Sequence, residues 1–199
     1  WPGRIWGLFF GLVILMGWGL VQRLLPHFRW SMLGWFSLGL LIAALLALLQ
    51  PVSLQLAWWG WPLVGGMALS AMLLPGISGS FLLVLVGVYP QLMTAVTVGD
   101  WQTLGLFGIG GVAGLLLMAH LLRWLMARME RILLSFLTGV VFGALVRIWP
   151  WQVSGPEGQL VLQWPTATTW LEPSVWILVG GLLGLGTLIA GNPKHGASQ

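Results

Sequence analysis

One short run between two long apolar segments combines backbone-breaking residues with hydroxyl groups: Pro75, Gly76, Ile77, Ser78, Gly79 and Ser80. Pro75 lacks a backbone donor, and Gly76 and Gly79 permit angles and close approaches that other residues cannot reach. Within a membrane, such irregular backbone is tolerated only where it is buried in protein or lines a wet cavity. Either serine could cap a helix continuing to Val88, whose partly positive N-terminus would bind an anion. A simple kink, or close packing through small residues, is the alternative.

A second residue that could bind a ligand is Arg147, near the outer end of a later apolar segment. Arginine inside a membrane is costly and is usually functional. Two interpretations are open: the guanidinium binds phosphate, or it snorkels to the outer headgroups beside Trp149 and Trp151. The acidic residues expected to be solvated in outer connections are Asp100, Glu157 and Glu172.

The composition of the chain, 58% hydrophobic and only 6% charged, indicates the secondary structure that surrounds these residues. This small number of polar groups cannot cover a water-facing surface. Lipid therefore has to be the solvent. The apolar residues lack the period-two alternation of barrel strands, which predicts helices. The apolar runs are Ile5–Val21, Met32–Leu49, Trp61–Leu74, Phe81–Val98, Leu104–Leu122, Ile132–Val146 and Val175–Ala190.

The remaining composition excludes several classes of function. The eight basic residues occupy short connections and form no face for nucleic acid. The absence of cysteine excludes disulfides and thiolate metal sites, and three scattered histidines make no metal centre, so we expect no cofactor and no metal. Most of the fifteen tryptophans lie near the ends of the apolar runs, as headgroup anchors do.

Charge predicts the topology. The connections Gln22–Trp30 and Arg123–Arg131 are rich in arginine, which makes both cytoplasmic by the positive-inside rule. The connection Trp149–Pro173 carries only acidic charges and is expected outside, whereas Lys194 places the C-terminal tail inside.

Counting the membrane crossings between these connections places the start and the end of the segment Trp61–Asp100 on the same face of the membrane. Two full spans are possible, but the middle of the segment has no positive charge, and Trp61–Leu74 reaches only about 21 Å against a hydrocarbon core of about 30 Å. We therefore predict a re-entrant hairpin over about 61–100. The expected fold is an all-α integral membrane protein with about five transmembrane helices and one re-entrant helical hairpin.

The sequence also repeats itself, since Gly7–Pro51 realigns on Gly105–Pro150. This predicts an internally duplicated transporter fold in one membrane domain over 1–199. Residues 1–51 are the remainder of the first repeat, 52–151 the second repeat, and 174–191 a final transmembrane helix. The counterpart of the Pro-Gly-Ile-Ser-Gly-Ser run would fall before Trp1, so we expect the first re-entrant element to be absent from this chain. Charge places both copies in the same orientation.

Three stretches carry a resemblance to a known family: Leu74–Leu83, Gly87-Val88-Tyr89, and Gly143–Trp151. They resemble the second half of the polyprenyl-phosphate transporter family, whose members carry a further Pro-Gly-x-Ser-Gly-Gly motif near the N-terminus. The resemblance implies a multi-pass protein of the plasma (inner) membrane. It would move undecaprenyl phosphate from the outer to the inner leaflet, for reuse in cell-envelope glycan synthesis, with no catalytic residue. The residues then expected to contact the lipid phosphate are Pro75, Gly76, Ser78, Gly79, Ser80, Tyr89 and Arg147.

Two alternatives stay open. Gly76–Gly79 also matches the Gly-x-Ser-Gly motif of the rhomboid intramembrane proteases, with His120 as the possible base. The predicted topology separates Ser78 and His120 in depth by about 10 Å, which disfavours this chemistry. The other alternative is a channel or a structural membrane subunit.

Overall fold

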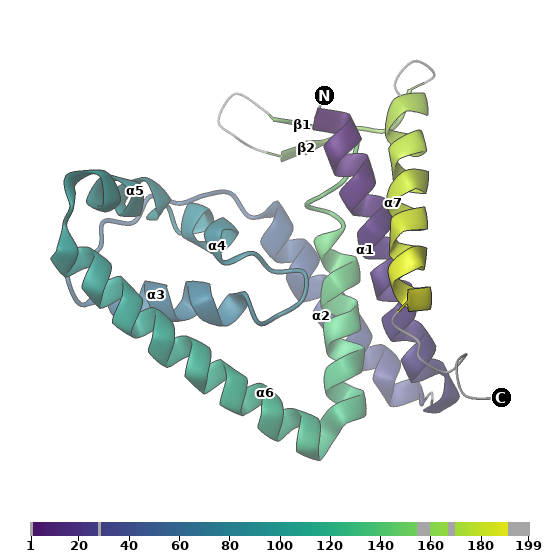
Figure 1. Cartoon of the computed structure of the whole chain (residues 1–199), viewed down its shortest axis with the longest axis horizontal. Coiled ribbons are helices and arrows are strands. Elements are labelled where there is room, and N and C mark those ends of the chain that lie inside the picture. The colour runs from purple at the N-terminus through teal and green to yellow at the C-terminus, as the bar shows by residue number, and fades with distance from the viewer. Residues whose placement is uncertain (1, 28, 155–159, 167–169, 191–199) are drawn as a thin grey trace. The chain divides into compact units, whose positions relative to one another are not determined.

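The computed structural model describes residues 2–27, 29–154, 160–166 and 170–190 and is mostly helical (Figure 1). Its elements are α1 (Pro2–Leu24), the 3-10 helix η1 (Leu25–His27), α2 (Trp30–Leu48), α3 (Gly60–Ala71), α4 (Gly79–Leu85), α5 (Tyr89–Val98), α6 (Trp101–Ala144), β1 (Gln152–Ser154), β2 (Leu160–Leu162) and α7 (Leu171–Ala190). The chain divides into two compact units. The terminal unit comprises Trp1–Leu48 and Leu134–Gln199, and the central unit comprises Leu49–Leu133.

Within the described residues, three helices are long and apolar enough to cross a membrane: α1, α2 and α6. The pair α4 and α5 would count as a fourth crossing only if taken together, and it is bent by 106° at its junction. The chain is therefore an all-α membrane protein in its main architecture. The count of about five spans stays a prediction, because it requires α6 to be two spans and α7 to be another.

The predicted connection Arg123–Arg131 contains a kink, at which the two helices that make up the 44 residues of α6 meet. The residues on either side of the kink are helical, because Leu, Met, Arg and Glu favour a helix and this stretch contains no Gly or Pro. The 44 residues correspond to about 66 Å of helix in total, about twice the thickness of a hydrocarbon core, and the kink divides this length into two parts. Helical geometry is interrupted at Met129, with φ −141° and ψ 42°.

In the terminal unit, α1 and α7 lie side by side and run in the same direction (Figure 1). A Cβ at Gly7 would overlap the carbonyl region of Pro173, and one at Gly11 would overlap the carbonyl oxygen of Ile177, so the contacts advance together along both helices. This parallel packing agrees with the charge-based topology, in which both helices begin on the outer face.

The terminal unit also packs α2 against residues 134–144 of α6. A Cβ at Gly39 would overlap the carbonyl oxygen of Phe136, and a Cβ at Gly139 would overlap the carbonyl oxygen of Phe36. Glycine at both places lets the two backbones approach closely, as small residues do between membrane helices. These two helices are also parallel, as the predicted topology requires.

In the central unit, α3 runs beside the first part of α6, and α4 returns alongside α3 (Figure 1). The buried core of this unit consists of Trp61, Val64, Ala68, Leu83, Val88 and Leu92. These residues come from α3, α4 and α5, together with Val88 just before α5, so apolar burial holds the two sides of the break between α3 and α4 together.

The connection between α6 and α7 contains a small antiparallel sheet that the sequence did not predict. β1 pairs with β2 with Gln152 opposite Leu162, and the N–H of Gln163 donates to the carbonyl of Trp151 at 2.8 Å. The three-residue strands are too short to show period-two alternation, which explains the omission. The predicted positions of Glu157 and Lys194 lie outside the described residues.

Candidate functional site

The break between α3 and α4 is a tight turn over Leu74–Ile77. The N–H of Ile77 donates to the carbonyl of Leu74 at 3.3 Å, and Gly76 has φ +86°. Proline at the second position and a positive φ at the third are the features of a type II turn, and that φ strains any residue with a Cβ. The Pro-Gly pair therefore reverses the chain between α3 and α4.

Ser78 and Ser80 follow this turn, and both are exposed. Their hydroxyl oxygens lie 2.9 Å apart and share a hydrogen bond. Ser78 occupies the N-cap position of α4 with extended angles, but its side chain makes no capping hydrogen bond. The predicted side-chain cap is thus wrong for Ser78, because its hydroxyl is paired with that of Ser80 instead.

Gly79 lies between the two serines and is buried. A Cβ at this position would overlap the carbonyl oxygen of Ala68 and lie 3.1 Å from Cγ of Met72. The backbone at the start of α4 is therefore pressed against α3, with the serine hydroxyls on either side.

The helix that was expected to reach Val88 ends at Leu85. Gly87 has φ +75°, and a Cβ there would overlap the carbonyl oxygen of Val52. The amides of Val52 and Leu54 donate to the carbonyls of Leu85 and Val86, at 2.9 and 3.3 Å. The Gln50–Gly60 connection therefore packs against the end of α4, which leaves α4 only seven residues long.

Tyr89 begins α5 and is 37% exposed. It lies beyond the C-terminal end of α4, whereas Ser78 and Ser80 lie at the N-terminal end. The length of α4, about 10 Å, separates them. The structure thus gathers Pro75, Gly76 and Ser78–Ser80 in one turn and leaves Tyr89 apart.

His120 is exposed on α6, and the described residues show no hydrogen bond between it and Ser78. The hydroxyl of Ser78 has the hydroxyl of Ser80 as its partner, and a hydroxyl is not a base that could activate a nucleophile. The geometry therefore does not assemble the serine-histidine pair of a protease.

Arg147 belongs to the terminal unit, where it follows the end of α6. Its N–H donates to the carbonyl of Ala144 at 3.0 Å, in the tight turns that finish the helix. The side chain is half-buried, and this burial lowers the pKa of the guanidinium from its ordinary value. An arginine keeps its positive charge at neutral pH despite such a shift.

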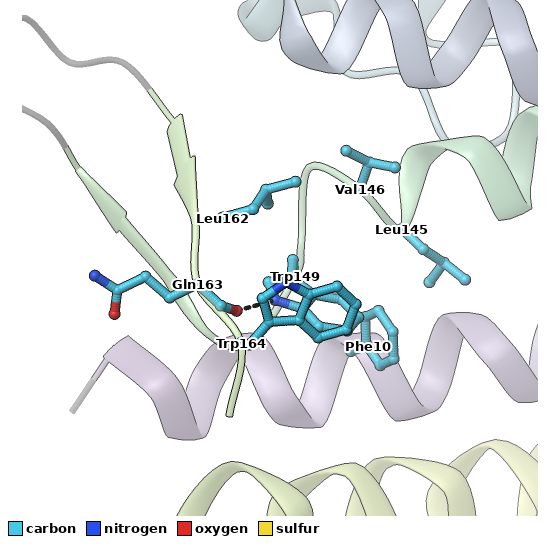
Figure 2. A pocket seen from close by; sticks show the side chains of 7 residues that line it. All are labelled: Phe10, Leu145, Val146, Trp149, Leu162, Gln163 and Trp164. Carbon is cyan, nitrogen blue, oxygen red and sulfur yellow. Dashed lines mark hydrogen bonds between the residues drawn. The ribbon is translucent and has the colours of Figure 1, made fainter. Parts of the chain in front are cut away.

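Trp149 is the centre of an aromatic cluster that sequence reasoning missed. Its ring centroid lies 5.7 Å from that of Phe10, 5.4 Å from that of Trp151 and 6.4 Å from that of Trp164. Figure 2 shows the rings of Phe10, Trp149 and Trp164, which line a pocket of about 480 Å³. The available signal was the concentration of tryptophans in one connection, which we attributed to headgroup anchoring alone.

Two acidic residues expected to be solvated have specific partners. Asp100 is the N-cap of α6, since its side-chain oxygen accepts from the N–H of Thr103 at 3.2 Å, and hydrogen bonds to Thr103 lower the pKa of its carboxyl. Glu172 forms an ion pair with Arg4, which joins the first turns of α1 and α7. Both side chains of the pair are exposed, so this pair stabilises the fold little.

The chain has relatives among known proteins. The profile of the family described as undecaprenyl phosphate translocase-like matches residues 1–158. A polyprenyl-phosphate transporter of Vibrio cholerae serotype O1 is 35% identical over 191 residues, which are 89% of this chain and 61% of that relative. The chain thus spans less than two thirds of the relative's length. No solved structure matches the chain.

Proposed function

The chain belongs to the undecaprenyl phosphate translocase-like family, and from this membership we propose that it moves a polyprenyl phosphate, undecaprenyl phosphate in particular, across the plasma membrane. We propose the direction from outer to inner leaflet, which returns the lipid carrier for cell-envelope glycan synthesis. The name of the Vibrio cholerae relative, polyprenyl-phosphate transporter, supports the substrate class.

The observation that carries the proposal is the exposed turn between α3 and α4. In an otherwise apolar hairpin, two hydroxyl groups and an irregular backbone are presented together at Ser78–Ser80. Polar groups inside a membrane need partners, and a phosphate passing the turn would provide acceptors for them.

A carrier also has to release its cargo. The turn holds no charged side chain, so hydroxyl and amide donors near Ser78 and Ser80 would hold a phosphate more weakly than a buried arginine would. Arg147, half-buried at the end of α6, would provide the first, stronger contact to phosphate arriving in the outer leaflet. The prenyl tail can remain in lipid throughout.

The test is leaflet exchange of undecaprenyl phosphate in proteoliposomes. The double variant Ser78→Ala, Ser80→Ala should exchange the lipid several-fold more slowly than the parent, because two phosphate donors are lost. Ser37→Ala, which removes an exposed hydroxyl from α2, should exchange at the parental rate. Exchange by the parent no faster than in protein-free vesicles would contradict the proposal, and binding without exchange would favour a structural subunit.

The same material tests the protease alternative, which neither the family match nor the relative supports. A phosphonofluoridate that labels Ser78, with the label lost in His120→Ala, would establish the protease. We expect no such label, because Ser78 is paired with Ser80.

A further inference from the structure

The connection between α6 and α7 contributes to the pocket described above. This pocket is separate from the turn at Ser78–Ser80. It is lined by Phe10, Leu145, Val146, Trp149, Leu162, Gln163 and Trp164. Its volume of about 480 Å³ lies within the range of small-molecule sites, about 300–1,000 Å³.

The chemistry of the lining is almost entirely that of hydrocarbon and aromatic rings. The indole N–H of Trp149 donates to the backbone carbonyl of Gln163 at 3.0 Å, so these two polar groups satisfy each other. Figure 2 shows the side chain of Gln163 extending away from the pocket. A ligand therefore meets apolar surface here, and its contacting part has to be apolar.

The aromatic walls of the pocket pack against one another, but part of the lining is exposed. The ring of Trp149 is held edge-on against Phe10, with an interplanar angle of 84°, and against Trp164, with 79°. Leu162 and Trp164 are nonetheless 44% and 84% exposed. Covering these side chains with an apolar ligand would be favourable, because it removes their surface from contact with polar groups.

A positive charge lies next to the pocket in the chain. Arg147 is in the turn between Val146 and Trp149, both of which line the pocket. A pocket with an apolar lining, two of whose residues flank a half-buried arginine in the chain, fits a ligand with a hydrocarbon body and one anionic end.

We propose that this pocket binds the isoprene units next to the phosphate of a polyprenyl phosphate, with the phosphate at Arg147. The inference rests on the proposed function and assigns it a site for the lipid tail. The flat, methyl-branched isoprene units can stack on the faces of Trp149 and Trp164, whereas flexible acyl chains lose more entropy there. The pocket would then distinguish the lipid carrier from ordinary phospholipids, which present the same phosphate chemistry.

The test uses a prenyl phosphate with a diazirine in its second isoprene unit, photolysed in proteoliposomes of the protein. Cross-links are expected on the peptides that contain Trp149 and Leu162–Trp164. Excess undecaprenol, which has the tail without the phosphate, should compete, and dioleoyl phosphatidate should not. Cross-links confined to other segments, or equal competition by phosphatidate, would overturn the inference.

A matched pair of variants adds a second measurement. Trp164→Ala should raise the probe concentration for half-maximal cross-linking roughly two- to tenfold, the loss expected for one aromatic contact. Trp101→Ala removes a similarly exposed indole, 81% against 84%, from the start of α6 and should leave it unchanged. Equal half-maximal concentrations in Trp164→Ala and the parent would count against the pocket.

The two proposals can fail separately. If the parent exchanges undecaprenyl phosphate while its cross-links avoid the pocket, this inference is wrong and the transport function stands. If the parent cross-links in the pocket but shows no exchange, the pocket stands as a prenyl-lipid site and the transport function is wrong.

Discussion

Gly79 shows how one atom can decide the geometry of the candidate site. Its backbone touches the carbonyl region of Ala68 where a side chain would have to lie, so the start of α4 can approach α3 only if residue 79 lacks a Cβ. This contact therefore determines the positions of the Ser78 and Ser80 hydroxyls.

Gly79→Val should therefore destabilise the protein, by about 1–3 kcal/mol, the usual cost of overpacking. It should also slow leaflet exchange more than Ser78→Ala does, because it displaces both serines. The control is Gly108→Val on α6, where a Cβ meets nothing within 4 Å. Thermal unfolding in detergent measures the difference, and equal melting temperatures for the two variants would contradict the close contact.

Arg147 makes a separate prediction about phosphate capture. Arg147→Ala should impair the binding of undecaprenyl phosphate more than Arg147→Lys, which keeps the charge but loses the planar fork that grips two oxygens. Binding to detergent-solubilised protein measures this, with Arg123→Ala on the exposed face of α6 as the control. Parental binding by Arg147→Ala would place the phosphate elsewhere.

At the scale of elements, the short helices α3 and α4 bear on the proposed hairpin. With 12 and seven residues they reach about 18 and 10 Å, too little for either to cross a membrane alone. The hydrogen bonds of Val52 and Leu54 return the end of α4 to the connection that precedes α3. We propose from this that the hairpin enters and leaves on the outer face.

Cysteine labelling tests this topology cleanly, because the chain has no cysteine of its own. Single cysteines at Gln55 and Asp100 should react with an impermeant thiol reagent added outside intact cells. A cysteine at Arg128 should react only after permeabilisation. Labelling of Gln55 and Arg128 from one side would exclude the hairpin in this orientation.

The beginning of α6 has a pH dependence of its own. Hydrogen bonding to Thr103 lowers the pKa of Asp100 from its ordinary 3.8, so the capping carboxylate stabilises the fold above that pH and ceases to do so as the pH falls through the lowered value. Asp100→Ala should thus melt slightly earlier than the parent at pH 7. The difference in melting temperature between Asp100→Ala and the parent should disappear in strong acid. Asp100→Asn, which caps without charge, should show no such convergence with Asp100→Ala.

The apolar runs predicted α1 and α2 to within a few residues, because a continuous apolar stretch in lipid has few alternatives to a helix. Prediction failed where local signals were weak. The two helices of α6 meet at Met129 with no intervening loop, and two three-residue strands formed in the connection after Trp149.

The candidate site divides in the same way. The turn at Pro75 and Gly76 was predictable, because these residue types restrict the backbone locally. The pairing of Ser78 with Ser80, the separation of Tyr89 and the rings around Trp149 were not, because they depend on tertiary packing and on where α4 ends.

At the scale of the whole molecule, the two units suggest different tasks. The central unit contains the turn with its serines, and the terminal unit contains Arg147 and the aromatic pocket. The glycine contact between α2 and the end of α6 belongs to the terminal unit, and it involves segments that the internal repeat aligns with each other. We propose on this basis that the chain does descend from a duplication.

That contact has the geometry of a homodimer within one chain. Gly39 meets the carbonyl of Phe136 as Gly139 meets that of Phe36, so a local two-fold axis along the helices relates the two sides. An ancestral half-length protein could therefore have self-associated through this helix before its gene doubled.

If so, Gly39→Ile and Gly139→Ile should lower the melting temperature by similar amounts, whereas Gly34→Ile, with nothing within 4 Å, should lower it less. A peptide covering Trp30–Leu48 should form parallel dimers in a bacterial membrane reporter assay, and its Gly39→Ile variant should not. A parent peptide that remains monomeric would contradict the ancestral dimer.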